Sequence, residues 1–291
     1  MVIISNKSGQ LGNRLFVFAH FIANAQEYGY EISNPSFFDY AHYFANIETD
    51  YFCGFPRRNS GKTVGKRLHA AYFKALKTGF SVCKALGVGN ALFKVMSLPK
   101  RGAELYSLSS PEYLRLREST RYLFVKGWLF RDPPLFDKHA ALIRDYFTPA
   151  PRHAENIARL IEKARQDCDL LVGVHIRQGD YKTWEQGRYY YRSDEYAALM
   201  RRFVGQHPGK RVRFLICSNE AQPKEDFAGL DVIFGNNHQF EDMYSFAQCD
   251  LLLGPPSTYT LWASFYGSVP LFVVRSVQDP VDPDAFIVAG G

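Results

Sequence analysis

The stretch LLVGVHIRQGDY occupies residues 170–181. Its first part, Leu170–Val174, is an apolar run with the length and composition of a buried parallel strand. The second part changes to polar groups and a glycine, and open α/β sheets bind ligands at such positions, just beyond the carboxyl end of a strand. Arg177 offers a planar fork of donors suited to phosphate, and His175 and Asp180 can accept or hold a proton. We therefore expect a ligand site at this strand end, although an ordinary ion pair would also explain Arg177 and Asp180.

The segment His175–Tyr181 resembles the H-x-R-R-G-D-Y signature of the α-1,2-fucosyltransferases (glycosyltransferase family 11). It is more loosely similar to the corresponding segment of the α-1,6- and O-fucosyltransferases. Gln178 stands where the family has its second arginine. One fixed positive charge therefore remains for a diphosphate where many relatives have two. Two further segments resemble the same family, and all three follow in the family's order.

The first of these is a glycine-containing turn, Lys7–Arg14, between an expected strand at Val2–Ser5 and an expected helix at Leu15–Tyr28. Backbone N–H groups at such a helix start can bind an anion or a sugar, but a plain strand-to-helix turn has the same pattern. The letters GQLGNRLF resemble the family's G-G-L-G-N-Q-x-F element. This resemblance implies that Asn13 and Arg14, the latter in place of a glutamine, face the donor–acceptor cleft.

The other segment, Glu241–Phe265, resembles the family's D-x-x-x-M-x-x-C … N-S-T-F-S-W-W-A pattern. Its residues predict a helix, a buried strand at Leu251–Leu253, a Gly-Pro-Pro turn and a helix that opens with hydroxyl groups. Ser257 and Thr258 could bind a diphosphate through hydroxyls and backbone N–H groups, or could serve as N-caps alone. Pro256 replaces the asparagine of the family, which removes one side-chain donor.

Strands and helices alternate in the remaining sequence. A strand at 122–128 and a helix at 136–147 form a block that resembles the family's G-Y/W-x-Q-x-x-x-Y-F segment. A stretch with two prolines, Thr148–Arg152, then marks the best domain boundary. Beyond it the pattern predicts helices and strands at 153–165, 193–204 (with Ser193 as its N-cap), 211–217 and 232–234. This order indicates a parallel, doubly wound half.

The resemblance implies an α/β, GT-B-like fold with two Rossmann-like halves facing a cleft. Residues 1–148 would form the acceptor-side domain, and residues 149–291 the nucleotide-sugar domain. The implied reaction is inverting transfer of L-fucose from GDP-fucose to a hydroxyl of a glycan acceptor, of the α-1,2 type, in surface polysaccharide synthesis and without a metal. A related transferase that uses a different nucleotide sugar and a non-catalytic glycan-binding protein on the same fold are the alternatives.

Departure of GDP builds charge on its β-phosphate, which fixed cations and hydroxyl donors must stabilise. Arg177, with Ser257 and Thr258, is the candidate for this role. His175 would contact the diphosphate or the guanine region.

Two roles call for a carboxylate. One is to read the N1–H and N2–H₂ donors of guanine, for which Asp242 is the candidate and Glu241 its rival. The other is to accept the proton of the acceptor hydroxyl as an oxocarbenium-like centre forms. Glu185 lies ten residues after His175, the offset at which the α-1,6-fucosyltransferases carry a proposed base. Asp180 is the alternative base.

Charge is distributed unevenly over the 291 residues, whose net charge is +6. No acidic residue lies between Asp50 and Glu104, whereas the interval 57–101 holds 11 lysines and arginines, so the rest of the chain is net acidic. Apolar residues at helical spacing predict an amphipathic helix in this interval, with a stripe made of Leu68, Ala71, Tyr72, Ala75 and Leu76. Such a helix can be a solvated face, or it can contact an anionic membrane surface or a lipid-linked acceptor. No nucleic-acid recognition motif accompanies the charge, so we expect no nucleic-acid partner.

Five scattered cysteines without a C-x-x-C pair predict reduced thiols, and no His/Cys spacing indicates a metal site. No apolar run approaches the ~20 residues that a membrane span needs. Met1 leads directly into Val2-Ile3-Ile4 rather than into a signal peptide. We therefore expect a cytoplasmic protein that contacts the inner face of the membrane peripherally.

Overall fold

The computed structural model describes residues 1–57, 65–85, 92–98 and 104–291, with the side chains at 66, 80 and 83–85 not among the described ones. Part of the basic interval, including Arg58, Lys62, Lys100 and Arg101, lies outside these residues. The chain divides into two compact units, Met1–Pro151 (to which Gly291 is joined) and Arg152–Gly290. The sequence places its boundary at residue 148.

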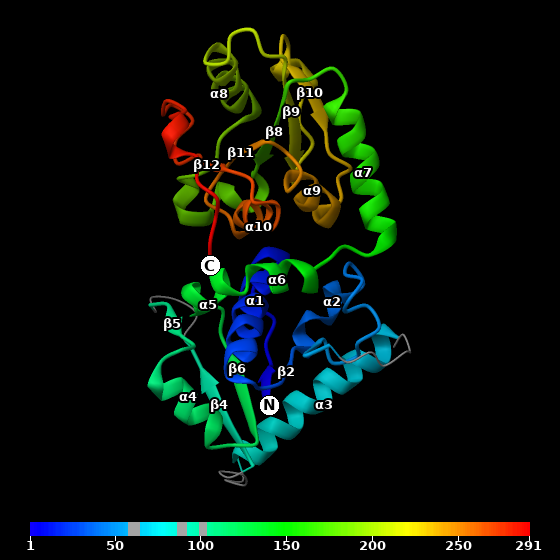
Figure 1. The fold of residues 1–291 in the computed structure, drawn as a ribbon, viewed down its shortest axis with the longest axis vertical. Helices are drawn as coiled ribbons and strands as arrows, with labels where there is room; N and C mark the ends of the chain where they lie inside the picture. Colours follow the sequence, from blue (N-terminus) through cyan, green and yellow to red (C-terminus); the bar gives the residue numbers. More distant parts are fainter. Residues whose placement is uncertain (58–64, 86–91, 99–103) are drawn as a thin grey trace. The chain divides into compact units, whose positions relative to one another are not determined.

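The first unit is built around a five-stranded sheet in the order β3-β2-β1-β6-β4 (Figure 1). Its neighbouring strands are parallel except for the β2–β3 pair. The strands are β1 (Val2–Ile4), β2 (Ile32–Ser33), β3 (Gly54–Phe55), β4 (Phe93–Ser97) and β6 (Tyr122–Lys126). A separate two-stranded sheet pairs β5 (Tyr106–Ser107) with β7 (Phe130–Arg131).

Helix α1 (Leu11–Tyr28) is the central helix of the first unit, and its residues from Leu15 to Ala25 are buried. It ends at Gly29, which has a left-handed backbone conformation (φ 63°) that glycine adopts readily. The other helices of this unit are η1 (Pro35–Phe37), α2 (Phe38–Ala41), α3 (Lys66–Ala85), α4 (Pro111–Glu118), α5 (Pro133–Lys138) and α6 (Ala140–Tyr146).

The second unit contains a five-stranded, all-parallel sheet in the order β10-β9-β8-β11-β12. The strands are β8 (Leu170–Ile176), β9 (Val212–Ser218), β10 (Asp231–Phe234), β11 (Leu251–Gly254) and β12 (Leu271–Val273). Its helices are α7 (Pro151–Arg165), η2 (Gly179–Lys182), η3 (Trp184–Gly187), α8 (Ser193–Gly205), η4 (Lys224–Phe227), α9 (Gln239–Phe246), α10 (Thr258–Gly267) and η5 (Pro283–Ala285). The predicted doubly wound, parallel half is confirmed.

Alternation along β8 decides which face of this sheet each residue covers. Val172, Val174 and Ile176 join a buried core with α8. Gly173 and His175 therefore point to the other face, since successive side chains of a strand alternate. A Cβ at Gly173 would lie 2.6 Å from the Phe246 ring of α9, so this position needs glycine. Figure 1 shows α7 and α8 on opposite sides of the strands.

Two local predictions are wrong. The helix expected at 136–147 is two helices, α5 and α6, separated at His139. The N-cap of α8 is Arg192 rather than Ser193, which is the first helical residue. Helix α3 forms in the basic interval, and most of its apolar stripe is exposed, with Leu68 64% exposed. The buried residue at this point of α3 is His69, which stacks on Phe38.

Among the described helices, none is both long and apolar enough to cross a membrane. Free thiols are found at each cysteine whose side chain is described, namely Cys53, Cys168, Cys217 and Cys249.

Candidate functional site

A cavity of about 390 Å³ lies at the carboxyl edge of the sheet in the second unit. Its walls come from the ends of β8, β9 and β10 and from the first turns of α9 and α10; the lining residues are His175, Arg177, Cys217, Ser218, Asn219, Glu220, Ala221, Asn237, Gln239, Asp242 and Tyr259. The chain runs from β8 to β9 and β10 in one direction and then returns to β11 on the other side of β8. The strand order therefore reverses beside β8, and ligands of open α/β sheets bind at such a reversal.

His175 lies in β8 and is 3% exposed. Its Nδ1 is 2.7 Å from the Thr260 hydroxyl, and its ring centroid is 4.7 Å from that of Tyr259. Burial, and then the positive charge of Arg177, lower the pKa of His175 to about 3. The imidazole is therefore neutral at physiological pH, and it would meet a ligand as a hydrogen-bonding group rather than as a charge. A Cβ at Gly254 would lie 3.1 Å from the Cβ of His175, so glycine at this position leaves room for the His175 side chain.

Arg177 lies one residue beyond β8, and its side chain is 16% exposed. Its Nε and Nη2 donate to the two carboxylate oxygens of Asp180 at 2.9 and 3.0 Å. The guanidinium also lies 5.7 Å from the centroid of the Tyr181 ring. The bidentate ion pair considered from the sequence is thus present, and it holds the guanidinium at the wall of the cavity.

Gln178, which replaces the family's second arginine, supports the loop instead of lining the cavity. Its Nε2 donates to the Tyr191 carbonyl at 3.1 Å, and its Oε1 accepts from Gln222 at 3.0 Å. The backbone N–H of Gln178 donates to the side-chain oxygen of Asn219 at 2.8 Å. The chain from β8 is therefore fixed to the chain that follows β9, where Asn219 lines the cavity.

Asp242 of α9 lines the cavity and is 4% exposed. Its Oδ1 accepts the backbone N–H of Asn236 at 2.8 Å. Burial, opposed by backbone hydrogen bonds and reinforced by the nearby Glu241 charge, raises the pKa of this carboxyl to about 6. A Cβ at Gly235 would lie 2.6 Å from Asp242 Oδ1 and 2.7 Å from Cys217 Sγ, so glycine is required for this close approach.

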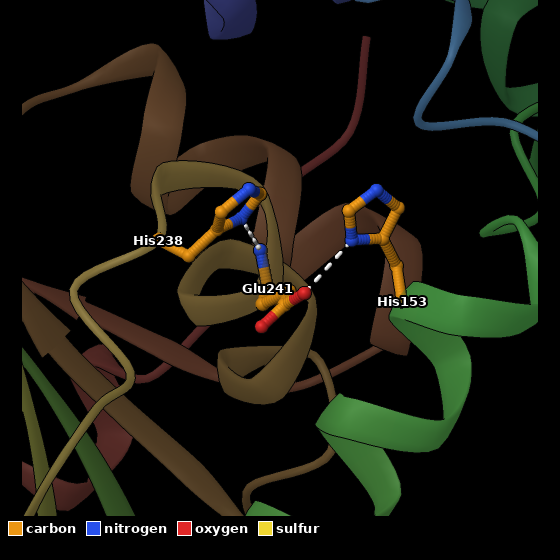
Figure 2. A group of neighbouring side chains, drawn as sticks. All are labelled: His153, His238 and Glu241. Atoms are coloured by element: carbon orange, nitrogen blue, oxygen red, sulfur yellow. Dashed lines mark hydrogen bonds and ion pairs between the residues drawn. The ribbon is translucent and has the colours of Figure 1, made fainter.

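The Glu241 carboxylate accepts a hydrogen bond from His153 of α7, as Figure 2 shows. His153 Nδ1 is 2.8 Å from Glu241 Oε1, while Asn156 donates to the same oxygen at 2.7 Å and Asn236 to the other at 3.3 Å. His153 Nε2 accepts from Arg152 at 3.2 Å, so the Nδ1–H is the donor to Glu241. The backbone N–H of Glu241 donates to His238 Nδ1 at 3.2 Å.

This hydrogen-bonded group, made of His153, His238 and Glu241, is called the latch below. Its candidate ligand atoms lie within 4.8 Å of one another, so among the described residues the latch is a group that could hold a metal ion. The Glu241 carboxylate already accepts three hydrogen bonds from protein donors. The evident consequence of the latch is that the chain from Asn236 to His238, which borders the cavity, is fastened to α7.

No protein-family model matches the sequence, and none of the curated proteins compared with it is similar. The structure, however, is similar to solved structures. A point mutant of Arabidopsis thaliana FUT1 in complex with GDP matches with a TM-score of 0.63 and 13% identity, over 98% of this chain and 73% of that chain. NodZ from Bradyrhizobium, a fucosyltransferase, matches with a TM-score of 0.55 and 16% identity over 97% and 96% of the two chains. POFUT1 in complex with GDP-fucose matches with a TM-score of 0.54 and 10% identity over 92% and 94%.

The fold is the GT-B fold of fucosyltransferases. The expected fold class is thereby confirmed. The N-terminal half and the C-terminal half of the chain each form one Rossmann-like unit.

Within the GT-B fold, the donor-side residues expected from the sequence fall into two groups. His175, Arg177 and Asp242 line the cavity of the second unit. Ser257 and Thr258 open α10, where Ser257 is the N-cap and accepts the N–H of Tyr259 at 3.2 Å. They are not among the residues that line the described cavity, whereas the next residue, Tyr259, is.

The two candidate bases lie on the short helices after β8. Asp180 is paired with Arg177. Glu185 is an exposed residue of η3 with a left-handed backbone (φ 48°), and it does not line the described cavity.

Asn13 and Arg14 belong to the first unit of the GT-B fold. Arg14 donates to the carbonyl oxygens of Gly9 and Ser36, both at 3.1 Å, and to Asp39 at 3.0 Å. Asn13 packs against Gly9, where a Cβ would lie 3.0 Å from its Cγ. Arg14 thus fastens the glycine turn after β1 to the segment around Asp39.

Further polar residues of the cavity are not among the site residues expected from the sequence: Ser218, Asn219, Glu220, Asn237 and Gln239. Their positions at and after the ends of β9 and β10 are nevertheless a usable signal, because the carboxyl ends of parallel strands meet at one edge of the sheet.

Proposed function

We propose that this chain is a fucosyltransferase, which transfers L-fucose from GDP-fucose to a hydroxyl of a glycan acceptor with inversion and in α-1,2 linkage, in surface polysaccharide synthesis. The observation that carries the proposal is the cavity at the strand-order reversal of the second unit, with Arg177, His175 and Asp242 on its walls. Support comes from the GT-B neighbours that are described as complexes with GDP and GDP-fucose. The second unit would hold the donor and the first the acceptor.

Arg177 is the proposed stabiliser of the leaving diphosphate. Departure of GDP concentrates negative charge on the β-phosphate, and a fixed guanidinium in a partly buried wall stabilises that charge without reorganising. Asp180 orients the fork through two hydrogen bonds. Because this guanidinium supplies the positive charge, the proposed reaction needs no metal. Ser257 and Thr258, at the start of α10, would assist through hydroxyl and N–H groups.

Asp242 is the proposed reader of guanine, since an ionised carboxylate can accept from both N1–H and N2–H₂. His175 would donate to or accept from the diphosphate or the guanine region as a neutral imidazole. Glu241 is not proposed for this role because its carboxylate faces α7.

The acceptor hydroxyl needs a proton acceptor as it attacks. Glu185 is the proposed base because it is exposed and lies shortly after the Arg177 segment. Asp180 is the second candidate, but its pairing with Arg177 fits an orienting role better.

The proposal is tested by incubating the protein with GDP-fucose and oligosaccharides that end in galactose, and by detecting the added deoxyhexose by mass spectrometry. Thermal-shift measurements across GDP-, UDP- and dTDP-sugars identify the nucleotide. We expect stabilisation by GDP and GDP-fucose, and we expect Arg177→Gln to weaken GDP binding by about 10- to 100-fold.

Other results would contradict the proposal. Stabilisation by a non-guanine sugar nucleotide alone would indicate a related transferase with another donor. Glycan binding that persists in Arg177→Gln without any nucleotide binding would indicate a glycan-binding protein.

We also propose peripheral contact of α3 with an anionic membrane surface. This helix exposes apolar Leu68 (64%) and Val82 (50%) beside exposed Arg67, Lys74 and Lys77. A basic helix with exposed apolar side chains can lie in the interface of a bilayer. Sedimentation with vesicles that contain phosphatidylglycerol should fall as salt rises, and equal binding to neutral vesicles would contradict this proposal.

A further inference from the structure

The first unit contains a cavity of its own, of about 430 Å³, outside the site described above. Three lysines (Lys7, Lys74 and Lys77), two phenylalanines (Phe38 and Phe73) and His69 line it. They come from the turn after β1, from α2 and from α3. Three separate segments of the chain thus converge on one basic and aromatic hollow.

Two of the residues that line this cavity, Phe38 and His69, stack on each other. The rings of Phe38 and His69 stack with centroids 3.6 Å apart and 4° between their planes. His69 is 5% exposed, and its Nε2 has no hydrogen-bond partner among the described residues. Burial lowers the pKa of His69, so the ring is neutral at pH 7. A buried polar atom without a partner is uncommon, and a ligand group could satisfy it.

The charge of the cavity is predominantly positive. Its carboxylate, Asp39, pairs with Lys7 at 2.5 Å and with Arg14 at 3.0 Å, so two cations already neutralise it. Helix α3 contains no acidic residue that could pair with Lys74 or Lys77. Lys77 Nζ lies 4.8 Å from the centroid of the Phe73 ring, which keeps this lysine near an aromatic face. Two lysines therefore remain to bind an anion.

We infer that this cavity binds a phosphate or carboxylate group of the acceptor, with the aromatic rings packing against the sugar or lipid to which that group is attached. Lysines attract and bind such oxyanions, and aromatic faces accept the apolar surface of an attached ring or chain. The assignment to the acceptor rests on the proposed function, in which the second unit holds the donor. The same chemistry could come from an anionic sugar or from the phosphate of a lipid carrier, and the test separates the two.

Isothermal titration of the full chain with four probes tests the inference: D-glucose, D-glucose 1-phosphate, D-glucuronate and geranyl diphosphate, in low-salt buffer without phosphate. We expect the anionic probes to bind more tightly than glucose. Lys74→Gln and Lys77→Gln should each weaken that binding about tenfold, the loss of one charged hydrogen bond. Arg67→Gln is the matched control because Arg67 is an exposed cation of the same helix that does not line the cavity.

The probes also identify the source of the anion. Similar lysine-dependent binding of glucose 1-phosphate and glucuronate would indicate an anionic sugar, whereas lysine-dependent binding of geranyl diphosphate alone would indicate a lipid-linked acceptor. The inference is overturned if no anionic probe binds more tightly than glucose, or if Arg67→Gln weakens binding as much as the lysine variants do.

The donor proposal is measured separately, through GDP titration of the same variants. The lysine variants should bind GDP normally, and Arg177→Gln should bind the anionic probes normally. If the unaltered protein binds no GDP but binds the anionic probes through Lys74 and Lys77, the donor proposal is refuted and the oxyanion site stands. The opposite result would refute only the oxyanion site.

Discussion

At the scale of single residues, Asp242 is the group whose protonation should be visible in solution. Its pKa of about 6 lies well above the usual 3.8 because the carboxyl is buried. The ionisable groups around it are Glu241 on its own helix, Cys217 on β9, Tyr259 on α10, and His175 and Arg177 at the end of β8. Of these, His175 stays neutral down to a pH of about 3.

GDP affinity should therefore depend on pH through Asp242. Above about pH 7 the carboxylate is ionised and can accept from guanine; below about pH 6 it is protonated, and affinity should fall by up to about tenfold per pH unit. Calorimetric titration of GDP between pH 5 and 8 measures this. The variant Asp242→Asn should bind weakly with a flat profile, and a wild-type profile that is equally flat would contradict the role of Asp242.

The same shift has a consequence for the protein without ligand. Because the folded-state pKa of Asp242 is raised, its contribution favours the folded state at low pH and is lost as pH rises from about 4 through about 6. Donor binding and stability thus have opposite pH dependences at this one carboxyl.

Arg177 allows a prediction about geometry rather than charge. Arg177→Lys retains a positive charge but loses the bidentate fork with Asp180. We expect GDP affinity to fall by about tenfold, measured by calorimetry. Arg165→Lys is the control, because Arg165 makes a similar bidentate pair with Asp250. Asp250 directly precedes β11, so this pair lies at the amino ends of the strands, away from the cavity at their carboxyl ends. Equal losses in both variants would show that Arg177 acts through stability alone.

At the scale of elements, the latch joins α7 to the start of α9. His153→Leu removes the donor to Glu241 and leaves a buried carboxylate with fewer partners. The free energy of unfolding should fall by about 1–3 kcal/mol. GDP affinity should fall as well, because Asn236 beside the latch donates to Asp242 and Asn237 lines the cavity.

The control for the latch is His207→Leu. His207 lies two residues beyond the end of α8, and its Nδ1 is 2.9 Å from the carbonyl oxygen of Phe203 in that helix. Both variants can be followed by urea unfolding and by GDP titration. We expect His207→Leu to leave GDP affinity unchanged. If His153→Leu lowers the free energy of unfolding but leaves GDP affinity unchanged, the latch contributes to stability and not to GDP binding.

Elements whose sequence carries a single strong signal were predicted well. The apolar runs of β8 and β11 are both short, buried strands in the structure, as their composition predicts. The position of helix α3 follows from its apolar periodicity, but periodicity identifies an apolar stripe without showing what covers it, and this stripe is largely exposed. The break at His139 separates two short helices whose apolar residues continue the same spacing.

The candidate site residues likewise include some whose positions the sequence predicts and some whose positions it does not. Residues directly after a strand, such as Arg177, line the cavity, because a strand end fixes where the next side chains lie. Ser257 is a hydroxyl at a helix start, and that pattern identifies a cap without locating a ligand. Glu185 is predicted from an offset along the chain, and an offset says nothing about how the short helices η2 and η3 direct the chain after β8.

At the scale of the whole molecule, each of the two units has its own sheet and its own described cavity. The walls of the cavity beside β8 come entirely from the second unit, and those of the basic cavity entirely from the first. Ligands of the two cavities should therefore stabilise different parts of the chain.

Hydrogen exchange measured with GDP at 100 times its Kd tests this expectation. Binding at that concentration stabilises the binding-competent state by about 2.7 kcal/mol, which is large enough to slow exchange clearly. Protection should be confined to segments that border the cavity of the second unit, 175–181, 216–221, 235–243 and 257–260, because these supply its walls and the hydrogen bonds behind them. Glucose 1-phosphate should instead protect the turn after β1 and residues 66–77 of α3. Protection of α3 by GDP alone would contradict the separation of the two sites, since no residue of α3 lines the cavity assigned to the nucleotide.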